Sequence, residues 1–297
     1  MNFSEKQKGI AALITLAAMY AFMGVFTRYL AVDMSIFQQV YLRLFAAAIL
    51  GTAIFYKKID FKKLFSVSIK EWTLLIFRAL TYYLLGTVMF NQAILETKIS
   101  TVSFISSIPM TAILGFLVIG EKISPKKILY IALAFVGVVI ISVRDFSSIF
   151  VWGNGEILAF LSAFFCSLSI VLRKWQTKKL NNIEMTQVII FFGGLMVLIG
   201  SFFFGGAWVA PAKFSIGVIT ALILGGLFNV IIIVLTNVGF EKIKTSLASN
   251  ILTLEMFFAV IFGFLFYREI PSLKAIAGAI LIVLSVIQMS KLPSIND

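Results

Sequence analysis

The chain has no histidine, a single cysteine and few charged residues. Histidine is the side chain that most often titrates near neutral pH and binds metals, and the single cysteine, Cys166, cannot form an intrachain disulfide. The sequence also lacks a phosphate-binding glycine loop followed by lysine, a metal-spaced set of histidines and cysteines, and a nucleophile elbow. It therefore predicts no metal, no cofactor, no enzymatic activity and no direct use of ATP.

The scarcity of charge also excludes an ordinary soluble domain. Charged residues make up 13% of the chain and hydrophobic residues 61%, whereas about a quarter of a soluble domain is charged. The mean hydropathy is +1.05. Uncharged runs such as 99–120, 185–212 and 214–240 can each cross a bilayer core, which needs about 20 residues of helix. Because the alternation typical of a spanning barrel is missing, the sequence predicts an all-α integral membrane protein.

Turn residues and charges divide this apolar sequence into ten expected transmembrane helices. They lie near residues 9–30, 36–56, 72–94, 99–119, 127–143, 155–172, 185–204, 215–237, 245–267 and 273–290.

The basic residues are divided unequally between the two sides of these spans. Of the 25 Lys and Arg residues, Arg43 and Arg78 lie inside spans, seventeen fall on the side of the N-terminus and six on the other side. By the positive-inside rule, this bias predicts a multi-pass protein of the cytoplasmic (inner) membrane with both termini in the cytoplasm. The net charge of +12 does not indicate a nucleic-acid partner, because the basic residues form clusters between spans instead of one continuous face.

The two halves of the chain resemble each other. Residues Leu95–Thr101 match Phe240–Ser246, and Gly120–Pro125 match Arg268–Pro271. Five spans per copy is an odd number, so the second copy must enter the membrane in the opposite direction. The sequence predicts two inverted five-helix repeats, residues 1–146 and 150–297, with a substrate site near the membrane midplane between them.

The tract from Ile108-Pro109-Met110 to Gly120-Glu121, followed by residues 127–141 with Gly137-Val138, resembles the EamA domain of the drug/metabolite transporter superfamily. A second copy runs from Thr253 to Glu269 with Gly278 beyond it, and Tyr41-Leu42-Arg43 and Arg78-Ala79-Leu80 are also similar to members of that family. The resemblance covers essentially the whole chain. It implies a ten-helix inverted-repeat carrier of small metabolites, often an exporter, and it is poor evidence for which substrate is carried.

Three ionisable side chains lie deep inside the apolar spans, namely Arg43, Arg78 and Glu255. Because an ion in hydrocarbon costs roughly 2.5–3.5 kcal/mol on insertion scales, such a residue is a candidate for function. Each arginine offers donors for a carboxylate or phosphate. The alternatives are a permanent helix-stitching contact for Arg43 and, for Arg78, an arginine that reaches the membrane surface.

Glu255 is the only acidic residue well inside a span. It can bind a substrate ammonium, or it can bind and release a proton during transport, because a buried carboxyl group can exchange protons near neutral pH. The alternative is a fixed salt bridge to Arg43 or Arg78. We expect the three ions to converge on one central pocket if they form the substrate site.

Uncharged polar side chains complete the predicted substrate site. Tyr82 and Tyr83 follow Arg78 by about one helical turn, and Pro109 is expected to kink the fourth span because it lacks an amide proton. The second copy lacks a matching proline, so no such kink is predicted there. The proposed substrate-binding residues are Arg43, Arg78, Tyr82, Tyr83, Ser103, Asn229, Asn250 and Glu255.

These features favour a secondary carrier or exporter of small polar metabolites, above all amino acids and related zwitterions. An arginine would bind the carboxylate of such a solute and Glu255 its amine. Two alternatives stay open, a carrier of organic anions or nucleotide-linked metabolites, with proton coupling through Glu255, and a multispan membrane enzyme or assembly factor. The expected partners are the lipid bilayer and a small solute, and the sequence leaves open whether the protein is a monomer or a homodimer.

Overall fold

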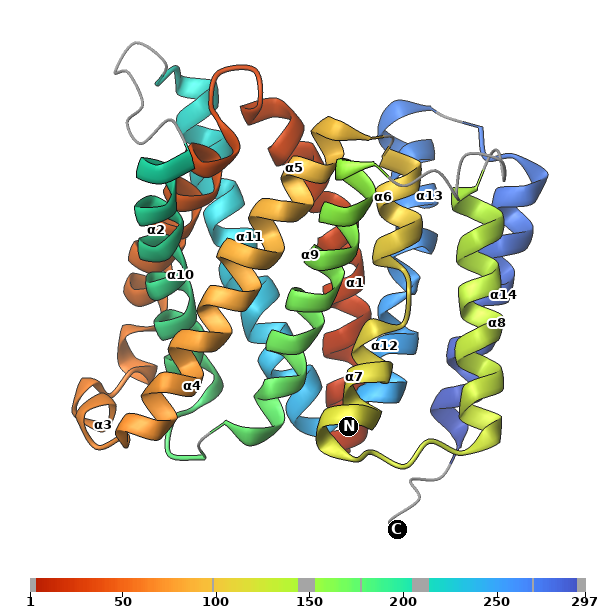
Figure 1. Ribbon diagram of the computed structural model, residues 1–297, viewed down its shortest axis with the longest axis horizontal. Coiled ribbons are helices and arrows are strands. Elements are labelled where there is room, and N and C mark those ends of the chain that lie inside the picture. The colour runs from red at the N-terminus through yellow and green to blue at the C-terminus, as the bar shows by residue number, and fades with distance from the viewer. Residues whose placement is uncertain are drawn as a thin grey trace.

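A computed structural model of the chain describes residues 4–97, 99–143, 153–176, 178–204, 214–268 and 270–292. The side chains of residues 24–28, 99, 100, 103, 263, 266 and 267 lie outside the description. Helices form all the regular structure of these ranges (Figure 1). They are α1 (Glu5–Leu30), α2 (Ile36–Phe55), η1 (Tyr56–Lys58), α3 (Phe61–Phe65), α4 (Ile69–Ala79), η2 (Leu80–Thr87), α5 (Val88–Glu96), α6 (Ile99–Ser106), α7 (Met110–Ile119), α8 (Pro125–Ser142), α9 (Asn154–Val171), η3 (Leu172–Trp175), α10 (Asn182–Phe204), α11 (Ile216–Lys242), α12 (Thr245–Leu252), α13 (Leu254–Tyr267) and α14 (Leu273–Lys291).

Local capping explains where several of these helices begin. Ser35 and Ser68 form capping boxes with Gln38 and Glu71, so that side chains satisfy amides that have no partner inside the helix. Ser124 caps α8 directly before Pro125, whose missing amide costs nothing at that position. At these three places, the serine that interrupts the apolar sequence is also the residue that caps the next helix.

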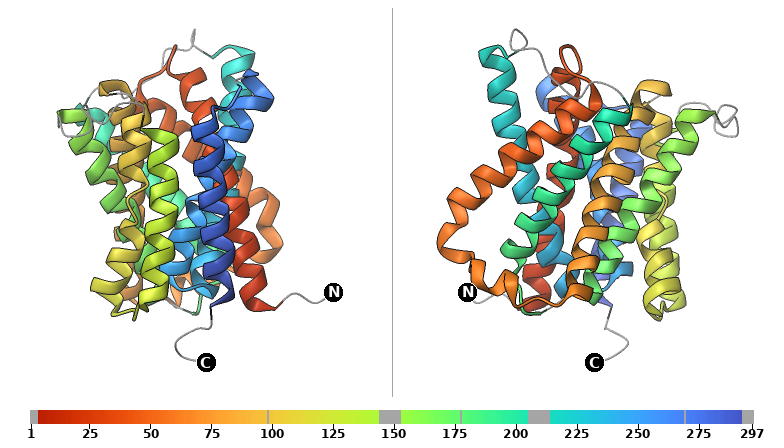
Figure 2. Two further views of the ribbon diagram at one scale, coloured as in Figure 1. Left: turned by 90° about the vertical axis from the view of Figure 1, so that its right-hand side faces the viewer. Right: turned by 60° about the vertical axis from the view of Figure 1, so that its left-hand side comes forward.

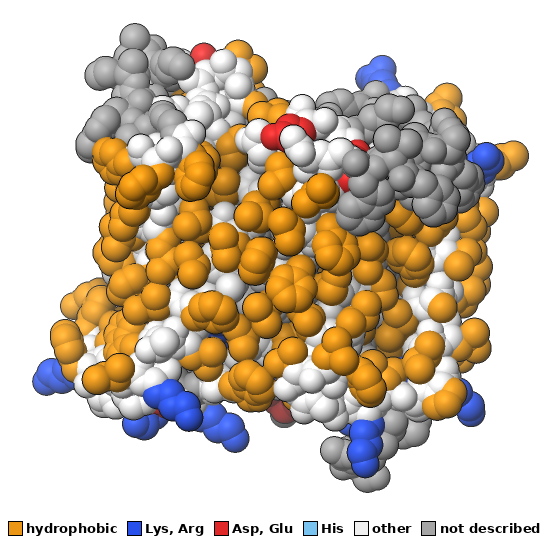
Figure 3. Space-filling view, in the orientation of Figure 1, with side chains coloured by type: hydrophobic (Ala, Val, Ile, Leu, Met, Phe, Trp, Pro, Cys, Tyr) orange, Lys and Arg blue, Asp and Glu red, His pale blue; other side chains and the backbone are white. Residues whose placement is uncertain are grey.

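Eight helices or continuous helical runs in the described residues are long and apolar enough to cross a membrane. Hydrophobic side chains cover the middle of the face in Figure 3, and Lys and Arg side chains gather mainly along its lower edge. The protein is therefore a multi-pass membrane protein. The eight runs are 36–58, 69–96, 125–142, 154–175, 182–204, 216–242, 245–262 and 273–291.

Both ends of the chain lie at the same end of the helical bundle (Figure 2). The Lys6 Nζ atom donates to the carbonyl oxygen of Leu292 at 3.5 Å. We call this the termini end and the opposite one the far end. The lysine-rich helices η1 and α3 also lie at the termini end (Figure 1).

Helices α8 and α14 pack against each other while running in opposite directions (Figure 1). A Cβ atom added to Gly137 would meet the carbonyl oxygen of Gly278 at 2.7 Å, and one added to Gly278 would meet that of Gly137 at 2.5 Å. The side chains of Ile282 and Ile141 occupy matching positions beside the two glycines. The contact is therefore reciprocal, and it requires glycine on both helices.

Three apolar helical segments depart from regular α-helix. Pro109 lies between α6, which ends at Ser106, and α7, which begins at Met110. A second interruption separates α12 from α13 at Thr253, where no proline stands. The Thr253 hydroxyl donates to the Asn250 carbonyl at 2.6 Å, a side-chain contact that competes with regular helical bonding. In the third segment, η2 is a π-helix between α4 and α5.

Candidate functional site

Arg78 is buried, with 3% of its surface exposed, and it bonds to residues of the second half of the chain. Its Nε donates to the Ser169 carbonyl at 3.0 Å, its Nη1 to Gln176 Oε1 at 2.9 Å and its Nη2 to Asn237 Oδ1 at 3.2 Å. All three acceptors are neutral. Arg78 therefore does not reach the membrane surface, and it joins the third span to α9, η3 and α11.

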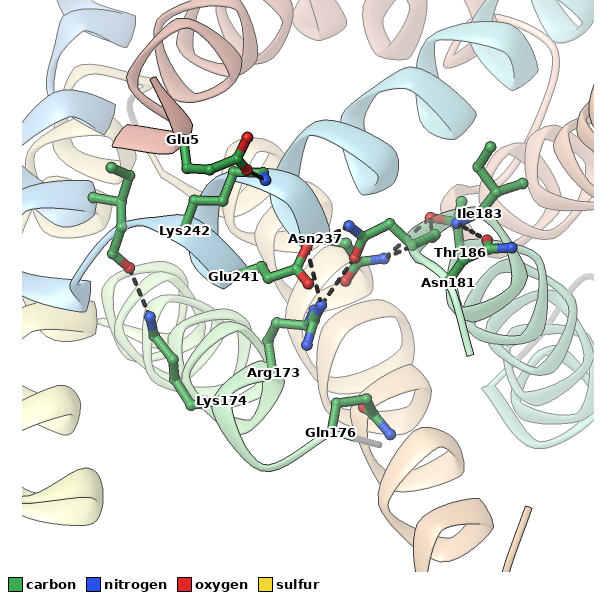
Figure 4. Close-up of polar contacts among 12 residues, drawn as sticks. Glu5, Arg173, Lys174, Gln176, Asn181, Ile183, Thr186, Asn237, Glu241 and Lys242 are labelled. Atoms are coloured by element: carbon green, nitrogen blue, oxygen red, sulfur yellow. Dashed lines mark hydrogen bonds and ion pairs between the residues drawn. The ribbon is translucent and has the colours of Figure 1, made fainter. Parts of the chain in front are cut away.

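Two partners of Arg78, Gln176 and Asn237, adjoin a larger polar network, part of which Figure 4 shows. Asn237 Nδ2 donates to Thr186 Oγ1 at 3.0 Å, which extends the network to α10. Arg173 donates to Asn182 Oδ1 at 2.9 Å and lies 3.7 Å from the carboxylate of Glu241. This network holds the helices of the two halves together at one end of the protein.

The π-helix η2 is matched by a stripe of small polar side chains on α9. Ser169 Oγ donates to the Arg78 carbonyl at 2.8 Å, Ser162 Oγ donates to the Gly86 carbonyl at 2.9 Å, and Cys166 Sγ lies 3.9 Å from the Tyr82 carbonyl. Residues 162, 166 and 169 share one face of a helix. A π-helix changes the backbone bonding pattern and often occurs at functional sites, and here α9 supplies extra donors along its length.

Tyrosine side chains occupy the centre of the bundle. The hydroxyl groups of Tyr20 in α1 and Tyr82 in η2 share a hydrogen bond of 2.8 Å. Tyr83 packs edge-on against Tyr82 and lies against Gly193, where a Cβ atom would collide with its ring. The Tyr83 hydroxyl is buried and has no hydrogen-bond partner in the described residues. Arg43, which is 3% exposed, lies close enough to Tyr83 for electrostatic interaction.

Glu255 stands at the start of α13, directly after the interruption at Thr253. Its side chain is partly accessible, although it lies within a membrane-crossing run. In the described part of the chain its carboxylate has no hydrogen-bond or ion-pair partner, and it lies within electrostatic range of Tyr20. Unlike Arg78, this charge has no contact in the described residues that fixes it to a neighbouring helix.

The other predicted residues lie at varied places. Asn250 is buried, accepts a hydrogen bond from Ser285 at 3.2 Å and leaves its Nδ2 without a partner among the described residues. Asn229 donates to the Gly225 carbonyl one turn earlier in its own helix. Ser103 lies in α6, and its side chain is outside the description.

The three buried ions are thus not joined by ion pairs in the described residues. Arg78 bonds within the polar network, Arg43 Nε donates to the Gln39 carbonyl of its own helix at 3.2 Å, and Glu255 lies within electrostatic range of Tyr20. Sequence reasoning missed Gln176 and Ser169 as partners of Arg78. The helical spacing of residues 162, 166 and 169 is the signal that points to this face of α9.

A groove on the outer surface offers a poorer candidate for a substrate site. It lies between α2 and α10 and is lined by Ala48, Ile49, Thr52, Ala53, Tyr56 and Phe191. Its lining is mainly apolar, and Ile49 and Tyr56 are strongly exposed, so it suits a bilayer better than a polar solute. No group of three His, Cys, Asp or Glu side chains in the described ranges is placed to hold a metal ion.

Comparisons with known proteins agree with this architecture. An uncharacterized transporter of Methanothermobacter thermautotrophicus is 27% identical over 221 residues, which cover 71% of this chain and 63% of that protein. This chain therefore spans less than two thirds of that relative's length. One crystal structure has the same fold, with a TM-score of 0.75, 14% identity and coverage of 99% of both chains.

The family match confirms the resemblance in the sequence. The EamA-like transporter family matches residues 7–143 and, a second time, residues 153–291. Since these two segments include nearly the whole chain, the protein belongs to the EamA-like transporter family and carries two copies of its unit.

Proposed function

We propose that this transporter is a secondary carrier of small zwitterionic metabolites, such as amino acids and their relatives, and that it works by exposing a central site alternately to each side. The observation that carries this proposal is the position of Glu255. It is a partly accessible carboxylate within a membrane-crossing run, and no described residue pairs with it. An intramembrane charge of this kind marks a substrate or proton pathway.

The amine of the substrate would bind Glu255, and Tyr20 and Tyr82 would supply hydroxyl groups beside it. Arg43 is our candidate for the substrate carboxylate, because it lies within electrostatic range of Tyr83. The partnerless hydroxyl of Tyr83 offers a further hydrogen bond to a bound solute. Asn250 and Ser103 belong to the two interrupted spans and remain proposed lining residues.

The proposed architecture has ten transmembrane helices in two inverted repeats, residues 1–146 and 150–297. It adds α1 and the interrupted pair α6–α7 to the eight runs described above. The reciprocal Gly137–Gly278 contact between antiparallel helices supports an inverted relation, because a two-fold axis would relate two such positions. The left-handed backbone of Gly120 (φ 74°) and Arg268 (φ 54°), which stand at matching places after α7 and α13, supports the repeat itself.

We further propose that the termini end lies in the cytoplasm. The lysine-rich helices at that end agree with the positive-inside rule for the cytoplasmic membrane. Export is the proposed direction, because it is common in the family that the sequence resembles. Glu255 is the proposed proton-coupling residue, since no histidine is present to take that role.

The competing substrate class is an organic anion or a nucleotide-linked metabolite held by both arginines. One observation weighs against it, because the Arg78 guanidinium already donates to three protein acceptors. The remaining alternative, a membrane enzyme or assembly factor, has no catalytic cluster in the described residues to support it.

Proteoliposomes test the proposal directly. Purified protein is reconstituted, and uptake of labelled zwitterions and of phosphorylated metabolites is measured with and without a pH gradient. We expect saturable uptake of at least one zwitterion that Glu255→Gln abolishes. Uptake confined to phosphorylated compounds, and unaffected by Glu255→Gln, would reject the zwitterion in favour of the anion.

A further inference from the structure

The carboxylate of Glu121 joins the connection between α7 and α8 of one repeat to the start of an interrupted helix in the other. Its Oε2 accepts from the Thr245 amide at 2.9 Å and also from the Thr245 hydroxyl. Its Oε1 accepts from the Ser246 hydroxyl at 2.6 Å and from the Ser246 amide at 3.3 Å. We propose that Glu121 is a positioning residue that keeps the carrier closed at the termini end, an inference that rests on the proposed transport function.

The first turn of α12 needs such a partner. Lys244 occupies the N-cap position and provides no side-chain cap, so the first amides of the helix have no acceptor of their own. A carboxylate at this place satisfies these donors and also interacts favourably with the helix dipole. Lys127 and Lys174 lie within electrostatic range of Glu121 and add to this attraction. Glu121 therefore acts as a cap supplied by the other repeat.

The backbone places Glu121 at this position. α7 ends at Ile119, and the left-handed conformation of Gly120 (φ 74°) then changes the direction of the chain. One turn earlier, Gly115 lies against Thr245 so closely that a Cβ atom would collide with its side chain. The contact between α7 and α12 thus combines a close backbone approach with the four hydrogen bonds of Glu121.

The positions that match Glu121 and Thr245 in the other copy, residues 269 and 100, have side chains outside the description. At the far end α6 packs on α8 and α9, and α13 packs on α1 and α14. The residues at both helix interruptions, Pro109 and Thr253, are partly accessible, as is Glu255. The contacts of Glu121 hold α7 and α12 together at the termini end of the described conformation. To expose Glu255 to the termini end, α12 must release Glu121.

A sided labelling experiment tests this role without any substrate. Ser249 follows Thr245 by one turn on the same face of α12 and is buried, so Ser249→Cys in a Cys166→Ser background is the reporter. An impermeant maleimide is added to membrane vesicles of each orientation. Ser66→Cys, exposed at the end of α3, identifies the vesicles whose termini end faces the reagent.

We expect Glu121→Gln to raise labelling of the reporter from the termini end by about tenfold, because the closed state loses its charge-assisted bonds. Glu184→Gln is the matched control. Glu184 is buried at the same end, accepts amides of Asn181 and Asp60 and joins the two halves of the chain, but it does not touch α7 or α12. In Glu184→Gln, the labelling rate of the reporter cysteine at position 249 should equal that of the parent protein.

An unchanged labelling rate in folded Glu121→Gln would overturn the proposal, and so would an equal rise in Glu184→Gln. If Glu121→Gln does not fold, the double variant Thr245→Val with Ser246→Ala removes only the two hydroxyl donors and should give a smaller rise. An unaltered rate in that variant also counts against Glu121. The labelling experiment needs no substrate. Its result therefore stays valid even if no transport of zwitterions is found.

Discussion

Arg78 and Glu255 look alike in the sequence, as single ions in apolar spans, yet their surroundings differ. Arg78 is surrounded by neutral acceptors from α9, η3 and α11. Glu255 has no partner among the described residues, and its side chain stays partly accessible. The first arrangement uses an ion to hold helices together, and the second leaves an ion available to a solute or proton. Burial alone therefore does not identify a binding residue.

The largest expected effect in this comparison is on stability at Arg78. Arg78→Met leaves the oxygen acceptors of Gln176 and Asn237 unpaired in the interior, and the apparent free energy of unfolding should fall by about 3 kcal/mol. Thermal and denaturant unfolding in detergent measure this loss. If Arg78→Met were as stable as the parent protein, Arg78 would not be needed to hold the helices together.

At Glu255 we expect a loss of transport without a loss of stability, the opposite of the expectation for Arg78. Glu255→Gln removes an unpaired charge from an apolar span, so the free energy of unfolding should stay the same or rise by about 1 kcal/mol. Transport should nevertheless fall at least about tenfold, if one charged contact of the substrate is lost. Glu96→Gln, on the exposed end of α5, is the control that should transport normally. Loss of folded Glu255→Gln would instead indicate a structural ion.

The contacts of α9 with η2 bear on the comparison between Arg78 and Glu255, because they hold the backbone next to Arg78 in place. Ser169→Ala removes the donor to the Arg78 carbonyl, two residues before the π-helix, and Ser162→Ala removes the donor to the Gly86 carbonyl inside it. Each should cost about 1 kcal/mol of unfolding free energy. Unfolding curves of the two variants measure this cost, with Ser66→Ala at an exposed position as reference. Two variants indistinguishable from Ser66→Ala would mean that α9 does not support η2.

The smallest effect is expected at the neighbouring tyrosines. Tyr83→Phe removes a buried hydroxyl without a partner and should leave stability unchanged or raise it by up to about 1 kcal/mol. Tyr82→Phe loses the bond to Tyr20 and should cost about 1 kcal/mol. Melting curves of both variants, beside their transport rates, separate the two hydroxyls. If Tyr83→Phe destabilised the protein more than Tyr82→Phe does, the Tyr83 hydroxyl would have to have a hydrogen-bond partner, contrary to the structure.

The sequence was a good guide to the membrane class, the family and the burial of Arg43 and Arg78, because hydropathy and charge depend on local composition. It did not predict the interruption at Thr253 or the π-helix η2. The first depends on a hydroxyl that competes with the helix backbone, and the second is accompanied by donors from α9, 76 to 91 residues away. Nor did it predict the neutral acceptors of Arg78, since these are set by the packing of distant helices.

The two glycines shared by α8 and α14 have a mechanical consequence. Their backbones touch without side chains between them, so the helices have no room to slide past each other with an altered register. The polar groups around Arg78 and Glu121, in contrast, can exchange protein partners for water. We expect any large rearrangement of this protein to leave the α8–α14 seam in place as a hinge, while the polar ties on the other helices open and close around it.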